Sequence, residues 1–120
     1  MIKLAFIFRQ APYGSSISRE GIDTLLAATA FCNEDEIAVF FIDDGIFNLI
    51  ANQNPTLILQ KDFTQSLKLL DLYDIENRYI CENTLQQYGL DDTDFILSCK
   101  KIDRSSLIKK VKLAEKVLTF

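Results

Sequence analysis

The sequence contains no histidine and no tryptophan, and it has only a few cysteines. The absence of histidine excludes a Ser-His or Cys-His catalytic pair, an imidazole general base and any metal site that depends on histidine. The three cysteines, Cys32, Cys81 and Cys99, are odd in number and far apart, and no CxxC pair is present. Such a set predicts neither a disulfide framework nor a zinc site. We therefore expect no metal centre in this protein.

Long hydrophobic runs are also missing. The longest uninterrupted run covers residues 37–42, whereas about twenty apolar residues are needed to cross a bilayer. Residues 1–4 lead directly into a strand-like pattern and show no signal-peptide cleavage site. We therefore expect a cytoplasmic protein without a membrane-spanning helix.

Basic residues are fewer than acidic ones: the sequence has 13 basic and 17 acidic residues, and its formal net charge is −4. This balance argues against a nucleic-acid-binding surface over the whole molecule. The basic side chains are concentrated between Lys100 and Lys116, where seven of them face two acidic ones. We interpret this segment as a solvated helix face, and the alternative is a docking surface for an acidic partner or RNA.

Short apolar runs alternate with stretches of helical spacing along the chain. The runs predict strands buried on both faces, at residues 2–8, 37–42, 79–81, 95–97 and 117–120. The stretches between them predict helices that begin at Ser18, Thr64, Asn83 and Asp103. Alternation of this kind is typical of an α/β protein with a mainly parallel sheet. At 120 residues the chain has room for one domain, residues 1–120.

Details of the helical stretches refine this prediction. The third helix is expected to end at Gly89, which suits the left-handed residue after a helix. Pro55, after Asn52–Asn54, predicts a surface turn. The residues expected to face the core are Ile22, Leu25, Leu26 and Thr29 in the first helix, Leu67 and Leu70 in the second, and Leu107, Val111 and Ala114 in the last.

In parallel sheets ligands bind at the carboxyl ends of the strands, which here correspond to residues 9–18, 43–48, 81–84 and 99–103. The glycine and serines of residues 9–18 could cradle a phosphate, as in flavodoxin-like FMN sites, but a helix cap explains them better. Asp43 and Asp44 could hold Mg²⁺, yet Asp-Gly after a strand favours a turn. We therefore expect no bound cofactor.

Cys81 is the strongest catalytic candidate. It ends a short strand and precedes a predicted helix, and a thiol at a helix N-terminus has a lowered pKa. Such a thiolate can accept sulfur as a persulfide. The negative charge of the adjacent Glu82 acts in the opposite direction. A small buried residue at a strand end is the alternative interpretation, and Cys32 and Cys99 are expected to fill the core.

Several motifs resemble the TusC-like proteins of the DsrE/DsrF superfamily. Residues 11–14, Ala-Pro-Tyr-Gly, and residues 18–27, Ser-Arg-Glu-Gly-Ile-Asp-Thr-Leu-Leu-Ala, match an APHG…REGLDALLA pattern. Residues 38–47 and 68–76 are similar to further parts of the same family. The resemblance runs from Ile2 to Phe120, and the motifs occur in the family's order.

The resemblance implies a three-layer α/β/α domain with a five-stranded sheet. It also implies assembly with TusB-like and TusD-like subunits into a heterohexamer, the TusBCD complex, which is a dimer of heterotrimers. That complex passes persulfide sulfur, through a downstream acceptor protein, towards 2-thiolation of the tRNA wobble uridine. The family's relay cysteine is assigned to the TusD-like subunit. Cys81 stands where the superfamily's cysteine motif falls, although Glu82 and Asn83 replace the small residues usual after it.

These observations leave more than one function open. The chain is expected to be a non-catalytic, accessory subunit of the relay, and the alternative is a sulfur carrier that forms a persulfide on Cys81. A flavodoxin-like cofactor binder is a distant third. We expect no direct binding of tRNA by the isolated chain. Aromatic residues favour interfaces, so we also expect a hetero-oligomer whose contacts use Phe40, Phe41, Phe47 and Tyr73.

Overall fold

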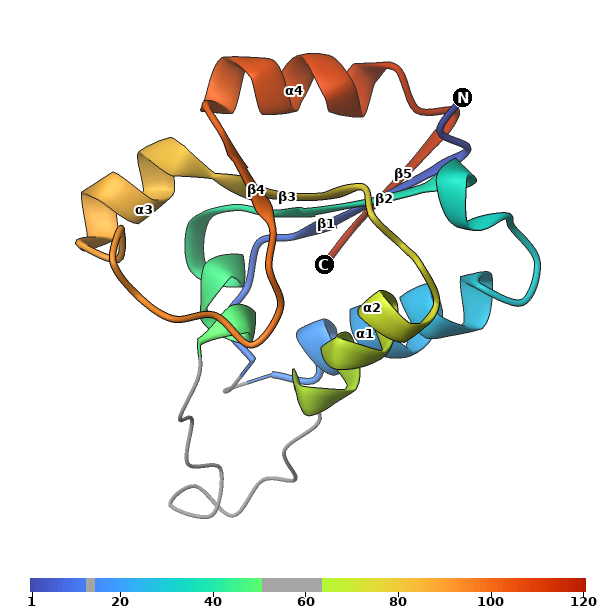
Figure 1. Cartoon of the computed structure of the whole chain (residues 1–120), viewed down its shortest axis with the longest axis horizontal. Helices are drawn as coiled ribbons and strands as arrows, with labels where there is room; N and C mark the ends of the chain where they lie inside the picture. Colours follow the sequence, from blue (N-terminus) through green and yellow to red (C-terminus); the bar gives the residue numbers. More distant parts are fainter. Residues whose placement is uncertain (13–14, 51–63) are drawn as a thin grey trace.

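A computed structural model of the chain describes residues 1–12, 15–50 and 64–120, and shows a single parallel sheet (Figure 1). Its strands are β1 (Leu4–Phe8), β2 (Ile37–Phe41), β3 (Arg78–Cys81), β4 (Lys100–Ile102) and β5 (Lys116–Thr119). The strand order is β4-β3-β2-β1-β5, and each neighbouring pair is parallel. The predicted mainly parallel sheet of five strands is confirmed.

Helices cover both faces of this sheet, which confirms the predicted α/β/α layering (Figure 1). The helices are α1 (Ile17–Ala28), α2 (Leu69–Leu72), α3 (Glu82–Tyr88) and α4 (Arg104–Lys112). Short 3₁₀ segments occupy Glu34–Glu36, Asp43–Leu49 and Thr64–Lys68. Below the sheet in Figure 1 lie α1 and α2, α4 lies above it, and α3 lies beside its carboxyl end.

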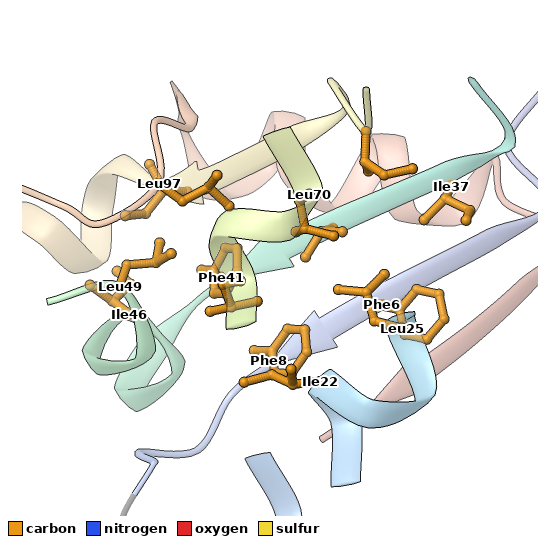
Figure 2. Close-up of a cluster of buried hydrophobic side chains, with 14 of the residues drawn as sticks. Phe6, Phe8, Ile22, Leu25, Ile37, Phe41, Ile46, Leu49, Leu70 and Leu97 are labelled. Carbon is orange, nitrogen blue, oxygen red and sulfur yellow. The ribbon is translucent and has the colours of Figure 1, made fainter. Parts of the chain in front are cut away.

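The face toward α1 and α2 holds the larger core, because alternate strand residues point toward it. Phe8 of β1 stacks on Phe41 of β2 at 5.3 Å between ring centroids. Ile22 of α1 lies beside Phe8 and Leu25 lies beside Phe6 (Figure 2), and all of them belong to one buried cluster. Further fully buried members of this cluster are Phe6, Val39, Ile46, Leu49, Leu67 and Leu70. The inward faces predicted for the first two helices are confirmed at Ile22, Leu25, Leu67 and Leu70.

The opposite face carries a smaller core under α4. Its buried members are Ala5, Ile7, Ala38, Phe40, Ile42, Cys81 and Leu107, with Val111 and Ala114 packed against them. The Asp103 side chain caps α4, since its carboxylate accepts a hydrogen bond of 3.1 Å from the Ser106 backbone N–H. The predicted cap and inward stripe of the last helix are therefore confirmed. Among the described residues no helix is long and apolar enough to cross a membrane.

Two of the predicted strands differ in the structure. Residues 95–97 form no strand; Phe95 makes an isolated antiparallel bridge with Ile50, and Leu97 is buried in the large core. The strand is instead β4, which is polar because an edge strand needs no apolar cover on both sides. The last strand, β5, was predicted to be buried, but it is the other edge and all of its residues are exposed.

Two helix starts also differ from prediction. Helix α1 begins at Ile17, so Ser18 lies inside it, and the Ser18 hydroxyl donates to the Gln10 carbonyl at 2.8 Å. Helix α3 begins at Glu82, one residue before the predicted cap Asn83. It ends as predicted at Gly89, whose φ is 68°. The predicted turn at Pro55 lies outside the described residues.

Candidate functional site at the carboxyl end of the sheet

The carboxyl ends of the central strands bring several of the predicted segments together, because parallel strands end at one edge. Asp43 follows β2, and Cys81 ends β3. Arg9 follows β1 directly, and Arg104 opens α4 just after β4. Asp43 contacts both arginines, which joins three segments that are distant in sequence.

Cys81 is the last residue of β3 and the residue that precedes α3, as its predicted place requires. Its side chain is fully buried, at 0% exposure, on the α4 side of the sheet. There it belongs to the small core that includes Phe40, Ile42 and Leu107. The thiol therefore occupies a helix start, as predicted, but it has no open surface toward solvent.

Asp43 holds the centre of this edge. Its carboxylate accepts hydrogen bonds from Arg104 at 3.0 Å and from Arg9 at 3.5 Å. The hydrogen bond from Arg104 lowers the pKa of Asp43, and the positive charges of both arginines add to that effect. Asp43 adopts a φ of 50°, and its backbone N–H donates to the Thr84 hydroxyl at 3.3 Å. The strained backbone of Asp43 is thus fixed by three hydrogen bonds, two to its carboxylate and one from its N–H.

Arg104 interacts with both Asp43 and Cys81. Its pKa is raised, first by the hydrogen bond and charge of Asp43, and to a smaller extent by interaction with Cys81. The guanidinium of Arg104 is shared with the Asp43 carboxylate, at 3.0 Å.

The first turns of α3 and α4 are tied together above Cys81. The Asn83 side-chain oxygen accepts a hydrogen bond of 2.7 Å from the Arg104 backbone N–H. Asn83 therefore serves the start of α4, whereas the sequence predicted a cap for its own helix. Thr84, which is also buried, binds the Asp43 N–H. Side chains of α3 thus bind the backbone N–H groups of both Asp43 and Arg104.

A pocket of about 510 Å³ opens at the same end of the sheet. Arg9, Asp43, Asp44 and Tyr88 are among the residues that line it, whereas Cys81 is not. The Tyr88 hydroxyl donates to Asp44 at 2.8 Å, and that bond raises the pKa of Tyr88. The open space therefore lies next to the polar network and does not reach the thiol.

The other predicted candidates have structural partners. Asp43 and Asp44 begin a 3₁₀ segment, and a side chain at Gly45 would overlap the carbonyl group of Phe8. Within the described residues no three Cys, Asp or Glu side chains lie close enough together to hold a metal ion. In the loop of residues 9–18 the Ser18 hydroxyl is engaged by backbone carbonyls, and Tyr13 and Gly14 lie outside the described residues.

The remaining cysteines and the basic segment show no gathered site. Cys32 and Cys99 are partly buried beside the large core, and burial raises the pKa of Cys99 to about 12. Lys109, Lys110 and Lys112 are exposed on α4. The Lys110 ammonium lies 5.0 Å from the centre of the Tyr79 ring, a cation–π contact.

Sequence reasoning missed Arg104, whereas Thr84 lies within the predicted segment 81–84 but was not singled out there; both residues contact Asp43. The segment predicted for the fourth strand end, residues 99–103, stops one residue before Arg104. Because Arg104 follows a good helix cap at a strand end, its position could have been included. Thr84 carries no such signal, since a threonine in a first helical turn is common.

Comparison with known proteins places this architecture. The family model described as DsrE/DsrF-like matches residues 2–120. The chain belongs to the DsrE/DsrF-like family. Its relatives include the TusC homolog of Haemophilus influenzae, 58% identical over 119 residues, and that of Pasteurella multocida, 54% identical over 119 residues. Both alignments cover 99% of this chain and 100% of the relative.

A more distant relative agrees with this placement in the DsrE/DsrF-like family, and a solved structure shares the fold. Protein TusC of Escherichia coli O157:H7 is 40% identical over 121 residues, with both chains covered completely. The crystal structure of the ychN protein from E. coli aligns with a TM-score of 0.81 at 20% identity over 100% of both chains, which shows a shared fold. The resemblance to TusC-like proteins is confirmed, and it supports a role related to sulfur relay.

Proposed function

We propose that this chain is an accessory subunit of a sulfur-relay complex and does not carry the sulfur itself. In this proposal it assembles with TusB-like and TusD-like subunits into a heterohexamer, a dimer of heterotrimers. The complex passes persulfide sulfur to a downstream acceptor protein and so towards 2-thiolation of the tRNA wobble uridine. The sulfur carrier is the TusD-like subunit, and this chain does not contact tRNA.

The burial of Cys81 carries the proposal. A relay cysteine must meet the persulfide of a donor and then present its own persulfide to an acceptor. The Cys81 side chain is 0% exposed and packs with Leu107 of α4. No donor sulfur can reach it unless α4 moves. The chain is consequently better suited to hold partners together than to exchange sulfur.

One observation favours the alternative, in which Cys81 is a sulfur carrier. The guanidinium of Arg104 interacts with Cys81, and reactive cysteines commonly lie beside a cationic side chain. In that case the Cys81 thiolate would attack the terminal sulfur of a donor persulfide. A new S–S bond would form at Cys81, the donor S–S bond would break, and the donor cysteine would leave as a thiolate.

The two functions are separated by Cys81→Ser, because serine cannot carry a persulfide. We expect cells with this variant to keep most of their tRNA thiolation, whereas the matching change in the TusD-like partner abolishes it. The cost to the free energy of unfolding should be about 1–3 kcal/mol if the new hydroxyl is buried without a partner. Thiolated and unthiolated tRNA would be compared in the two strains.

The control is equal protein level and an assembled complex in each strain, shown by native mass spectrometry. Complete loss of thiolation from Cys81→Ser in an intact complex would contradict the accessory role and support the carrier. A wild-type chain that forms no complex with TusB-like and TusD-like subunits at micromolar concentration would contradict both.

A further inference from the structure

Three exposed apolar side chains lie at or just beyond the C-terminal ends of α1 and α2. Phe31 is 88% exposed, Leu72 is 72% exposed and Tyr73 is 44% exposed. Both helices lie on the same side of the sheet (Figure 1). Tyr73 lines a recess of about 370 Å³ together with Thr29 and Cys32, which flank Phe31. We call Phe31, Leu72 and Tyr73 the Phe31 patch.

Among the described residues, no neighbouring element covers this patch. Phe31 follows the last turn of α1, and its neighbour Cys32 packs against the large core. An aromatic ring of this size gains stability by burial. Exposed apolar groups that gather on one surface mark contact sites in soluble proteins. Phenylalanine and tyrosine are also enriched at the energetic centre of interfaces.

Acidic side chains border the Phe31 patch on one side. Glu34 lines the recess of the patch and also a neighbouring recess of about 370 Å³. That second recess is lined by Asp35, Asp74 and Glu76 as well. Over the described part of the chain the ion pairs involve Glu36, Asp43 and Asp71, so these four carboxylates form none. The rim therefore presents negative charge that is not neutralised within the described chain.

An apolar centre with an acidic rim specifies the chemistry of its partner. A partner face that offers a hollow for Phe31, with lysine or arginine around it, would bury the ring and pair the carboxylates. An acidic surface or RNA would be repelled by the same rim. The basic helix α4 lies on the opposite side of the sheet, so it adds no positive charge to this corner (Figure 1).

We propose that the Phe31 patch is the docking surface for a partner subunit whose contact face combines an apolar hollow with basic side chains. The identity of that partner as a TusB-like or TusD-like subunit rests on the proposed function. The docking surface itself rests on exposure and charge. It places the contact at the ends of α1 and α2, and not at the carboxyl end of the sheet.

The test compares two leucines of similar exposure on opposite sides of the sheet, Leu72 at 72% and Leu113 at 76%. The chain would be co-expressed with the TusB-like and TusD-like subunits of its own genome. We expect Phe31→Ala, and separately Leu72→Lys, to weaken the complex at least about 30-fold, the effect of losing an interface hot spot. Leu113→Lys should change the dissociation constant less than about twofold. Native mass spectrometry and titration would measure both.

The acidic rim is tested separately by charge reversal. Glu34→Lys with Asp74→Lys should weaken the complex about tenfold at low salt, and the difference should shrink at high salt because screening removes it. Circular dichroism and the thermal midpoint of each isolated variant serve as the folding control. The same titration with a second copy of this chain tests self-association.

The outcomes separate the two proposals. Suppose that the wild-type complex forms and that the Phe31→Ala and Leu72→Lys variants each bind as tightly as the wild type. The Phe31 patch is then not the docking surface, and the proposed function still stands. Loss of binding from Leu113→Lys with none from Phe31→Ala would place the contact on the α4 side and overturn the inference. Self-association through Phe31 would replace the proposed partner with a second copy. Absence of any wild-type complex would overturn the proposed function.

Discussion

The carboxyl end of the sheet and the Phe31 patch are opposites. At the carboxyl end the groups with chemical potential, a thiol, a carboxylate and two guanidinium groups, are bonded to one another or buried. At the patch the groups have no reactivity, and they face solvent. A site that exchanges sulfur would show the reverse, an exposed thiol within a well-packed frame. The difference supports the proposal that this chain acts through contact more than through chemistry.

The same contrast appears between the two sides of the sheet. The side under α1 and α2 buries aromatic and aliphatic side chains in one large cluster, whereas the side under α4 buries a smaller one that contains Cys81. The larger core continues to the corner where Phe31 emerges, since Cys32 packs against it. A rigid core behind an exposed ring is the arrangement that a preorganised contact surface needs.

The largest effect is expected at the core behind these regions. Phe41 is 0% exposed and stacks on Phe8. We expect Phe41→Ala to lower the free energy of unfolding by about 3–5 kcal/mol, because it removes a buried ring and leaves a cavity. Urea unfolding followed by circular dichroism would measure it. A loss below about 1 kcal/mol would show that the core is not packed as described. The burial of Phe40 and Phe41 also shows that the prediction of a partner contact at these two side chains is wrong.

The packing at the carboxyl end of the sheet depends on a close backbone approach at Gly45. A methyl group there would overlap the Phe8 carbonyl, which belongs to the strand next to β2. We expect Gly45→Ala to cost about 3 kcal/mol or more, since the backbone itself would have to move. The control is Gly89→Ala, because a Cβ added there would meet no atom within 4 Å apart from the adjoining residues. Only its φ of 68° is unfavourable, and we expect a cost of about 1–2 kcal/mol. Equal thermal midpoints for the two variants would contradict this account.

The ion pairs of Asp43 are expected to contribute less. The folded pKa of Asp43 is lowered, chiefly by Arg104. The contribution is therefore present above the unfolded pKa of about 3.9 and is lost as the pH falls below it. Both side chains are partly exposed, so we expect Arg104→Gln to cost only about 0.5–1 kcal/mol at pH 7. The difference from wild type should shrink between pH 4 and lower values.

Urea midpoints measured from pH 7 down to pH 3 would test this pH dependence. Arg19→Gln is the matched control, because Arg19 is exposed on α1 and forms no ion pair with a described residue. A difference between Arg104→Gln and wild type that stays constant with pH would show that packing, and not the charge of Asp43, accounts for the loss.

The elements that sequence predicts well are those with a local cause. The runs at β1 and β2 are continuously apolar because helices cover both of their faces, and this pattern is visible in the sequence. The cap at Asp103 and the glycine at Gly89 are likewise local signals. The edge strand β4 was missed because its residues, Lys-Lys-Ile, carry no apolar pattern.

The features that sequence could not supply depend on pairs of distant residues. Arg104 and Asp43 are 61 positions apart, and Asp43 and Thr84 are 41 positions apart. Their contacts arise only when the sheet forms. The exposure of Phe31 was missed for another reason, since a phenylalanine near a helix end looks the same whether it packs inward or outward. Tyr73 alone, among the aromatic residues predicted for an interface, lies in the Phe31 patch.

The smallest effect on stability is expected at the patch. Phe31 is 88% exposed, so its ring buries little area in the isolated chain. We therefore expect Phe31→Ala to change the free energy of unfolding by less than about 0.5 kcal/mol, in contrast to the same substitution at Phe41. Urea unfolding of the two variants under identical conditions is the measurement, and each serves as the control of the other. A cost at Phe31 close to that at Phe41 would mean that the ring belongs to the core of the isolated chain. The contrast between the carboxyl end of the sheet and the Phe31 patch would then fail. A negligible cost would show that the ring lies outside the core of the isolated chain, so any weakening of the complex by Phe31→Ala would then act on partner binding and not on folding.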